Sequence, residues 1–425
     1  MIKYKHKIRL IHVGTCDLAK FKISYKKEKN MATKNYSNGT YNGDVNSSGV
    51  EHGWGEYRWT ESGARYEGDW VNGQRTGTGT YYYPSGNVYT GGFKNGKLHR
   101  KGKITFASGS WYEGDWNEGD RTGKGVYKWP DGSTYVGDFV KGAKNGKGKY
   151  SWSDGSYYDG DWKDDKRTGY GEYFFADSGD MYKGYWFEGS EHGTGKITYG
   201  DGGYYDGEWA NGEREGFGTM QLESGDEYTG FWKHNKFNGK GKYSWKSGGY
   251  YEGDFVDDFF CGHGVRVWSN GDKFEGEWKD DKRNGKGKLT FHDGAWYDGD
   301  WVQDNREGHG KFSWACGDLY EGDWKNDRRT GEGVYIWPSG RKHKGTFEDG
   351  EIQGFGTSLY SSGAAYEGNW VDGDWNGEGI YVDADGNAYK GNWKDFKTAD
   401  SVVAIMNGES EPVYGSMVNG EFIKG

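Results

Sequence analysis

The sequence predicts an all-β fold: an elongated, solenoid-like, single-layer antiparallel sheet of consecutive 23-residue β-hairpins. Two observations predict it. A Tyr-x-Gly-x-Trp pattern returns every 23 residues, which indicates a repeat array rather than one core with one active site. Within each return, side chains alternate with the period of two that is typical of strands. The first residues of the pattern lie at positions 41, 66, 89, 112, 135, 158, 182, 205, 228, 251, 274, 297, 320, 343, 366 and 389.

One repeat, residues 66–88, shows how each unit forms a hairpin. Residues 66–70 alternate between an aromatic and glycine face and an acidic face, so they predict a first strand. Residues 71–76 are polar, include Asn-Gly and predict a turn. Residues 77–83 alternate again and predict a second strand, and residues 84–87, Pro-Ser-Gly-Asn, predict the turn into the next repeat. Fifteen complete hairpins are expected, with no helical period in the array.

The two faces of these strands predict different chemistry. In the repeat that begins at residue 274, Gly285 and Gly287 share one face, and Lys286 and Lys288 share the other. Without a Cβ atom, the paired glycines allow a neighbouring ring to lie flat on the backbone. We expect the lysines to form a cross-strand ladder with Asp and Glu, each pair worth about 0.2–1 kcal/mol.

Composition narrows the classes of protein. The chain has 22 Trp, 35 Tyr and 20 Phe, which supply apolar area at regular positions, and 79 Gly but only 4 Pro. Three cysteines in 425 residues favour a reducing compartment. No stretch approaches about 18 apolar residues, so no membrane-spanning helix is expected. The net charge is −10, and the array carries all of the negative excess, which argues against nucleic acid as a partner.

Residues 1–40 form a basic segment that we expect to be disordered. Residues 1–30 carry a net charge of +7 and a short apolar patch at residues 8–13. Three interpretations stay open: a poor signal peptide, a basic membrane-surface segment, or an extension that precedes a true start at Met31. The array then covers residues 41–399, and residues 400–425 are expected to form a degenerate hairpin that caps the edge of the sheet.

Two departures from the period suggest binding points. The residue before the repeat tyrosine is aromatic in alternate repeats, on the face opposite Tyr, Gly and Trp, and is either a relic of duplication or a row of docking points. Its members are Trp111, Tyr157, Tyr204, Tyr250 and Trp296. The second departure is Phe259-Phe260-Cys261, which is expected to occupy a turn that is polar in other repeats.

No pattern indicates a catalytic residue, a metal site or a cofactor. Cys261-Gly262-His263 offers two candidate ligands in one turn, which is too few for a tetrahedral metal site. The segment 119–125 resembles a phosphate loop but has the wrong spacing and no following helix. The flanks of the array are too short for a catalytic domain, so we expect the chain not to be an enzyme.

The pattern Tyr-x-Gly-x-Trp-x-x-Gly-x-x-x-Gly-x-Gly, iterated at 23 residues over residues 41–399, resembles the MORN repeat (membrane occupation and recognition nexus). Its clearest copies begin at residues 66, 112, 158, 297 and 320. The resemblance implies an array of about 15–16 repeats without a catalytic domain, and roles as a scaffold, dimerisation platform or partner-binding groove. It also implies cytoskeletal, ciliary or membrane-apposed assemblies in the cytoplasm, with lipid contact as a less direct implication. Phe274 and His343 replace the repeat tyrosine.

The first hypothesis for function is therefore a non-catalytic scaffold that binds protein partners along an aromatic groove and self-associates, for example as a homodimer. The alternative is a peripheral adaptor that contacts a phospholipid surface through the basic N-terminal segment. No cofactor is expected. The candidate partner-binding residues are Tyr112, Trp116, Tyr158, Trp162, Tyr297, Trp301, Tyr320, Trp324, Trp111, Tyr157, Phe259 and Phe260.

Overall fold

The computed structural model describes residues 31–425. The basic segment 1–30, with its membrane-surface interpretation and the proposed start at Met31, lies outside the described residues. The chain divides into two compact units. The first covers the described residues up to Pro130 together with Val140–Gly142, and the second covers Asp131–Phe139 and Ala143–Gly425.

The first unit is an antiparallel sheet in which consecutive strands pair. Its strands are β1 (Met31–Tyr36), β2 (Gly39–Val45), β3 (Glu51–Trp59), β4 (Arg65–Val71), β5 (Gln74–Tyr82), β6 (Val88–Lys94), β7 (Lys97–Thr105), β8 (Trp111–Asn117) and β9 (Asp120–Lys128).

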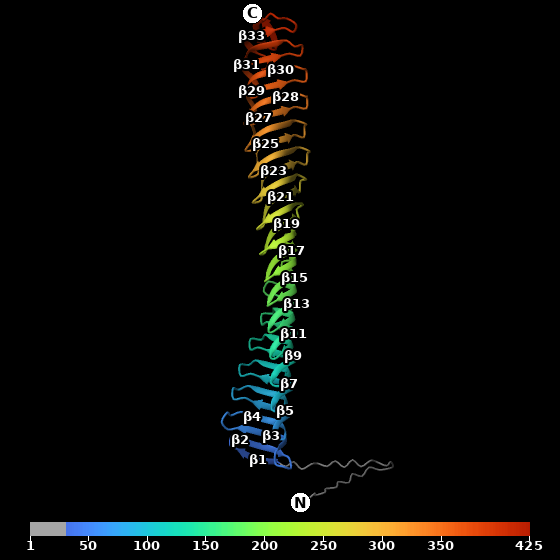
Figure 1. Cartoon of the computed structure of the whole chain (residues 1–425), viewed down its shortest axis with the longest axis vertical. Helices are drawn as coiled ribbons and strands as arrows, with labels where there is room; N and C mark the ends of the chain where they lie inside the picture. Colours follow the sequence, from blue (N-terminus) through green and yellow to red (C-terminus); the bar gives the residue numbers. More distant parts are fainter. Residues whose placement is uncertain (1–30) are drawn as a thin grey trace, which may run out of the picture. The chain divides into compact units, whose positions relative to one another are not determined.

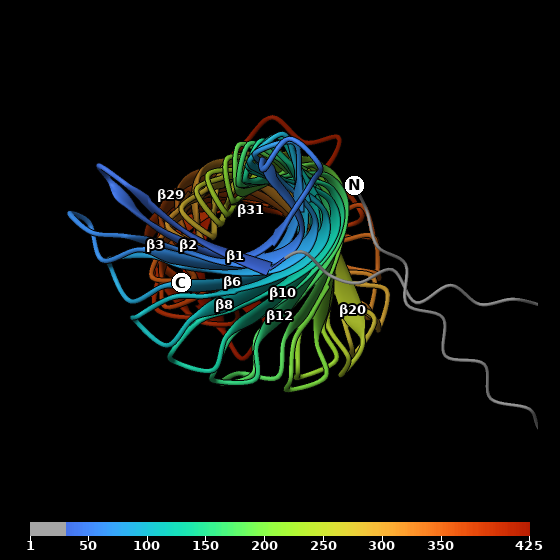
Figure 2. The same cartoon turned by 90° about the horizontal axis from the view of Figure 1, so that it is seen from below.

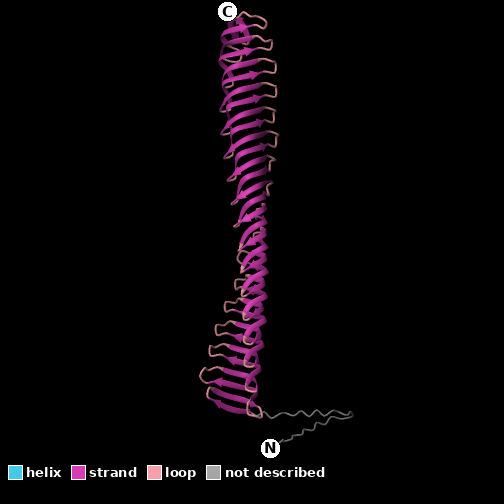
Figure 3. Ribbon diagram, viewed as in Figure 1, coloured by secondary structure: helices cyan, strands magenta, loops and turns pink. Residues whose placement is uncertain are grey.

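The second unit repeats the same hairpin in chain order (Figures 1 and 3). Its strands are β10 (Thr134–Val140), β11 (Ala143–Ser151), β12 (Tyr157–Lys163), β13 (Lys166–Phe174), β14 (Met181–Phe187), β15 (Ser190–Thr198), β16 (Tyr204–Ala210), β17 (Glu213–Gln221), β18 (Glu227–Lys233), β19 (Lys236–Ser244), β20 (Gly249–Val256), β21 (Phe259–Trp268), β22 (Lys273–Lys279), β23 (Lys282–Thr290), β24 (Trp296–Val302), β25 (Asn305–Ser313), β26 (Leu319–Lys325), β27 (Arg328–Ile336), β28 (Lys342–Glu348), β29 (Glu351–Leu359), β30 (Ala365–Val371), β31 (Asp374–Val382), β32 (Ala388–Trp393), β33 (Ala399–Ile405), β34 (Val413–Val418) and β35 (Glu421–Lys424).

Residues 31–425 contain strands and turns but no helix, which confirms the predicted all-β fold of consecutive antiparallel hairpins. Within the second unit, the strands from β10 through β20 to β31 turn progressively against one another when the sheet is viewed along its length (Figure 2). Such twisting follows from the chirality of the backbone. No helix among the described residues is long and apolar enough to cross a membrane.

The turn within each hairpin is shorter than the sequence predicts. In the hairpin of β24 and β25, only Gln303 and Asp304 join the strands, and both have positive φ, as a type I′ turn requires. The pairing then shifts by a β-bulge between Gly299 and Asp300. The prediction of a six-residue turn is therefore wrong, because the bulge interrupts the alternation while the backbone stays extended.

A single layer buries its rings by folding them onto its own backbone. The ring of Tyr297 lies on Gly299 and Gly310, which face each other on β24 and β25. Its hydroxyl donates to the carbonyl oxygen of Asp300 at 3.0 Å. Trp301 packs edge-on against the same ring at 5.1 Å, and Trp324 of the next hairpin does so at 5.3 Å. We call this the core face, and the face that carries the alternating charged residues the polar face.

Both ends of the array depart from the repeat. β1 pairs with β2 from Met31↔Asp44 to Tyr36↔Gly39, so eight residues of the expected 1–40 segment, six in β1 and two in β2, lie in the sheet. At the other end, β33, β34 and β35 extend the sheet by three strands after β32. The sequence anticipates one hairpin there.

Candidate binding surfaces

The repeat Tyr and Trp residues predicted to line a partner-binding groove are core residues instead. None is more than 6% exposed, in the set Tyr112, Trp116, Tyr158, Trp162, Tyr297, Trp301, Tyr320 and Trp324. Each tyrosine ring rests on paired glycines and packs edge-on against the tryptophan of its own hairpin. Burial keeps the hydroxyls neutral donors, and it raises the pKa of Tyr112 to about 12. The prediction of an open groove made by these rings is therefore wrong.

The aromatic residues of alternate repeats lie on the polar face, as predicted. Each ring is half-buried, because a lysine side chain covers it. The ammonium of Lys103 lies 4.2 Å from the ring centre of Trp111, and that of Lys149 lies 3.8 Å from that of Tyr157. Tyr204, Tyr250 and Trp296 are covered in the same way by Lys196, Lys242 and Lys288. These cation–π contacts give the row a role within the sheet, and its role in docking stays a prediction.

Phe259 and Phe260 begin β21 rather than occupying a turn, because Asp257-Asp258 already form the two-residue turn. Phe259 is 49% exposed. Phe260 stacks face to face on Tyr251, with ring centres 3.8 Å apart. The prediction that Phe259-Phe260-Cys261 occupies a turn is therefore wrong, and Phe260 belongs to the core face.

Seven repeats place an arginine where Phe260 lies, for example Arg283, Arg306 and Arg329, and this arginine connects one hairpin to the next. The guanidinium of Arg306 lies 5.8 Å from the ring centre of Tyr297 and donates to the carbonyl oxygen and the carboxylate of Asp327, at 3.0 and 2.9 Å. Asp327 lies in the turn of the following hairpin. Phe237, Phe260, Ile352 and Trp375 occupy the arginine position in four repeats of the second unit.

The polar face carries the predicted ladder of ion pairs, formed between consecutive hairpins. Lysine ammonium groups lie 2.6–2.9 Å from aspartate oxygens at one register position, in the pairs Lys101–Asp115, Lys147–Asp161, Lys240–Asp254 and Lys286–Asp300.

Four aromatic residues interrupt that ladder. At the same register position, Tyr170 pairs with Tyr185 and Phe217 with Phe231, and the ring centres are 5.7 and 5.6 Å apart. All four side chains are 47–51% exposed. We call Tyr170, Tyr185, Phe217 and Phe231 the aromatic patch. The patch was not among the residues predicted from the sequence, although rings at positions that hold Lys and Asp in other repeats are a signal for it.

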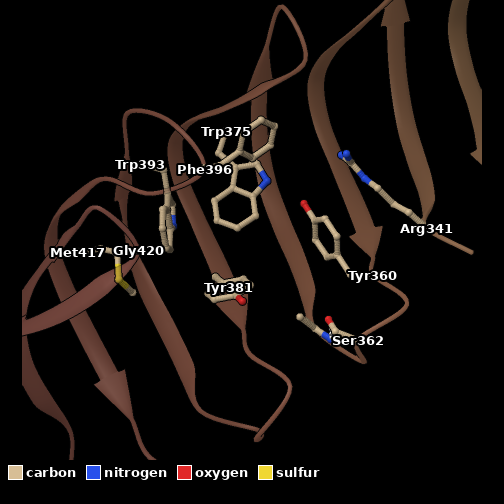
Figure 4. Close-up of a pocket in the computed structure, with 10 residues that line it drawn as sticks. Arg341, Tyr360, Ser362, Trp375, Tyr381, Trp393, Phe396, Met417 and Gly420 are labelled. Atoms are coloured by element: carbon tan, nitrogen blue, oxygen red, sulfur yellow. Dashed lines mark hydrogen bonds between the residues drawn. The ribbon is translucent and has the colours of Figure 1, made fainter. Parts of the chain in front are cut away.

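A second feature is a pocket of about 390 Å³ on the core face near the C-terminal end. We call it the end pocket. Its lining comes from β31, β32 and β34, from the turn before β28 and from the turns after β29, β32 and β34. It comprises Arg341, Tyr360, Ser362, Ala364, Trp375, Tyr381, Trp393, Phe396, Met417 and Gly420. The Arg341 guanidinium, the Tyr360 hydroxyl and the Trp375 indole nitrogen turn toward one another (Figure 4). Arg341 Nε and Trp375 Nε1 are buried without a hydrogen-bond partner.

Beside the end pocket, His343 and Ser358 form a buried polar pair. Ser358 Oγ lies 3.1 Å from His343 Nδ1, and neither residue is exposed. Burial, to which the positive charge of Arg341 adds, lowers the pKa of His343 to about 4. A serine and a histidine at this distance can act as nucleophile and base, but this pair has no solvent access, so no substrate can reach it.

Among residues 31–425, no group of three or more His, Cys, Asp and Glu side chains is arranged to hold a metal ion. The ion pairs on the polar face instead involve side chains that are largely exposed, such as Lys286 and Lys240. They therefore act as a solvated ladder within the sheet.

Comparison with solved structures gives only remote likeness. The TCP domain of SAS-4 from Drosophila melanogaster, in complex with a proline-rich motif of Ana2, is 12% identical with a TM-score of 0.25, over 42% of this chain and 90% of that one. The TCP10 domain of CPAP from Danio rerio, in complex with a STIL peptide, is 11% identical with a TM-score of 0.19, over 68% and 99%. These scores are too low to support a functional inference. Curated proteins give no match.

The comparison with family models is specific. The MORN repeat model matches fourteen consecutive segments, which begin at residue 66 and end at residue 388. All fourteen begin where the sequence pattern places a repeat, whereas the copies at 41 and 389 are not matched. The matches cover most of the chain, and the hairpin of each repeat is present in the structure. The chain therefore belongs to the MORN repeat family.

Proposed function

We propose that this chain is a non-catalytic scaffold that binds protein partners in a cytoplasmic assembly, and that the aromatic patch on the polar face is a contact surface. The observation that carries the proposal is the exposure of four rings at positions where neighbouring hairpins have ion pairs. Rings at these positions are not needed for the sheet, since a Lys–Asp pair fills the same place in other hairpins.

The physics of exposed rings favours a protein partner. Tyr and Phe supply large contact areas at low cost in side-chain entropy. The two ring pairs, which are separated along the sheet by Thr194 opposite Glu208, present exposed apolar groups of the kind that mark interaction sites. Phe187, which is 57% exposed at the end of β14, lies two residues after Tyr185 on the same strand and enlarges the apolar surface. The ion pairs Lys147–Asp161 and Lys240–Asp254 stand on either side along the sheet and supply a charged rim.

The core face offers less to a partner along most of its length. Its repeat tyrosines are fully buried, and opening them to a ligand would expose several rings at once. A scaffold of this construction therefore presents the variable positions of its repeats and keeps the constant ones inside.

The test replaces the four rings of the aromatic patch by the Lys and Asp residues that form ion pairs at the same register position in other hairpins. The ladder variant carries Tyr170→Lys, Tyr185→Asp, Phe217→Lys and Phe231→Asp, which should preserve the sheet. Phe355→Lys is the matched control, since Phe355 is 57% exposed at the same register position of β29, opposite Asn369. A photo-crosslinking amino acid at position 170 identifies what contacts the patch in the native cell.

We expect the wild type and Phe355→Lys to retain the same protein partners and the ladder variant to lose them. Retention of all partners by the ladder variant would exclude the patch as a contact surface. The scaffold proposal itself fails if light scattering and crosslinking show a monomer with no protein partner.

The basic segment 1–30 supports a second candidate function, a peripheral membrane adaptor. Its net charge of +7 would attract anionic lipid by about 1 kcal/mol per basic residue near the surface. Liposome pelleting of the full chain against a chain that starts at Met31 tests this function. Equal pelleting of the two chains would rule out the segment as an anchor.

A further inference from the structure

The end pocket forms where three consecutive repeats depart from the pattern. The arginine position holds Ile352 in the hairpin of β28 and β29 and Trp375 in that of β30 and β31. Trp375 stacks on Tyr366, with ring centres 4.1 Å apart. Its other neighbours, Trp393 and Phe396, pack against it edge-on at 4.8 and 5.4 Å. The result is a pocket with aromatic walls where other repeats have a guanidinium.

Arg341 brings a positive charge into this pocket from an unusual position. The corresponding residue two places before the repeat tyrosine is small or acidic in most repeats, for example Ala295, Asp318 and Ala364. The guanidinium lies 4.2 Å from the ring centre of Trp337 and 5.0 Å from that of Tyr360. Its Nε is buried with no hydrogen-bond partner, and no carboxylate lines the pocket.

A second donor is left unused beside it. Trp375 is 3% exposed, yet its indole N–H has no hydrogen-bond partner. The Tyr360 hydroxyl turns toward this N–H (Figure 4) and interacts with it, but the geometry of a hydrogen bond is not met. Elsewhere in the second unit, a repeat tryptophan uses this N–H: Trp370 donates to the carbonyl oxygen of Gly356 at 3.2 Å. Two buried, unpaired donors at one place carry a desolvation cost that a bound acceptor would remove.

The chemistry of the lining selects the acceptor. One guanidinium without an ion pair favours a single negative charge, and its planar donors match a carboxylate. The hydroxyls of Tyr360 and Ser362 add further donors, and the rings of Trp375, Tyr381 and Trp393 with the Met417 thioether favour an apolar body. A volume of about 390 Å³ lies at the lower end of the range for small-ligand pockets.

We propose that the end pocket binds a carboxylate attached to an apolar or aromatic group, with the carboxylate on Arg341 and the Trp375 N–H and the apolar group between Trp375, Tyr381 and Trp393. The carboxylate can come from the C-terminus of a peptide, from an acidic side chain beside an apolar one, or from a small organic acid. This inference does not depend on the aromatic patch, which lies on the other face of the sheet.

The first experiment titrates the full chain with 3-phenylpropionate and with 3-phenylpropionamide by calorimetry and saturation-transfer NMR. We expect the acid to bind at least tenfold more tightly than the amide, because a charged acceptor strengthens the hydrogen bonds. Arg341→Gln should weaken binding of the acid tenfold or more. Trp375→Phe, which keeps an aromatic wall and removes the N–H, should weaken it severalfold.

The matched control is Arg328→Gln, which removes an exposed arginine paired with Asp349 at 3.1 Å and outside the lining. It should bind the acid as the wild type does. Thermal melts confirm that each variant is folded, and Arg341→Lys, which keeps the charge but loses the planar donors, should fall between wild type and Arg341→Gln.

A spectroscopic readout separates binding at Arg341 from binding elsewhere. A carboxylate on Arg341 reduces the positive charge near His343, so the imidazole pKa of His343 should rise on binding, as followed by NMR. Three peptides then distinguish the sources: one ending in a free Phe carboxylate, its amide, and a capped peptide with internal Glu-Phe. Binding of the acid but of no peptide assigns the pocket to small organic acids. Equal binding of acid and amide, unchanged binding by Arg341→Gln, or no binding of any probe would overturn the proposal.

Discussion

The ring of Tyr297 lies so close to Gly310 on the neighbouring strand that a Cβ built on this glycine would fall 2.5 Å from Cε2 of the ring. We therefore expect Gly310→Ala to force the ring off the backbone and to destabilise this hairpin by roughly 1–3 kcal/mol, as overpacking does. Hydrogen exchange of the β24 and β25 amides measures the loss locally, which suits an array without a single unfolding transition. His309→Ala, on the polar face of the same strand, is the control and should change exchange little.

The hydroxyl of the repeat tyrosine contributes less to the stability of its hairpin than the ring does. Phe274 occupies this position in one hairpin, remains fully buried, and packs against Trp278 and Trp301 at 5.1 and 5.5 Å. We expect Tyr297→Phe to cost about 1 kcal/mol, the value of one hydrogen bond. Tyr297→Ala should cost about 3–5 kcal/mol, because it leaves a cavity over the paired glycines. Equal costs for the two variants, measured by the same exchange experiment, would contradict this division.

The arginine that joins consecutive hairpins should act on the turn of its successor. Arg306→Phe reproduces the arrangement of Phe260 on Tyr251 and keeps the ring packing. It removes the donors to Asp327. We predict that exchange at the Asn326-Asp327 turn accelerates severalfold while exchange in β24 and β25 changes little. Faster exchange throughout β24 and β25 instead would mean that Arg306 mainly stabilises its own hairpin.

His343 makes the stability of its hairpin depend on pH. Burial lowers its pKa from 6.5 to about 4 in the folded chain, so between these values the unfolded state binds the proton and the folded state does not. The stability is therefore complete above pH 6.5, falls as the pH drops, and levels off near pH 4. The loss is at most about 3 kcal/mol. His343→Tyr restores the tyrosine found in other repeats and should remove this pH dependence. Hydrogen exchange of the β28 and β29 amides should then differ between wild type and variant at acidic pH, and the difference should shrink toward neutral pH.

The strands and the order of the hairpins followed from the sequence because a period of two inside a period of 23 admits few other arrangements. Tyr297, Gly299 and Trp301 share a face in the sequence and in the structure. What the pattern could not show is that the ring would cover its own strand. An exposed groove and a buried row of rings have the same alternation, and the difference arises from the distance between Tyr297 and Gly310.

The binding surfaces were harder to foresee for a related reason. Most of the predicted binding residues recur from repeat to repeat. The informative residues are those that differ from their equivalents in other repeats: Tyr170, Phe217, Arg341 and Trp375. The end pocket also requires Phe396, which lies between β32 and β33, and Met417 of β34. Their approach to Trp375 depends on pairing beyond the last clear repeat, where no period guides the prediction.

The hydrogen bonds that cross between hairpins also decide how the second unit would respond to mechanical tension. Trp324 reaches back to the carbonyl oxygen of Gly310, and Arg306 reaches forward to Asp327, so the junction of β25 and β26 is fastened from both sides. At the junction of β19 and β20, Phe237 replaces the arginine and Phe255 replaces the tryptophan. The strand ladder, ring packing, the Lys240–Asp254 ion pair and the hydrogen bonds between Phe237 and Asp258 remain there. A pulling force along the sheet should therefore unzip the protein first between these two strands.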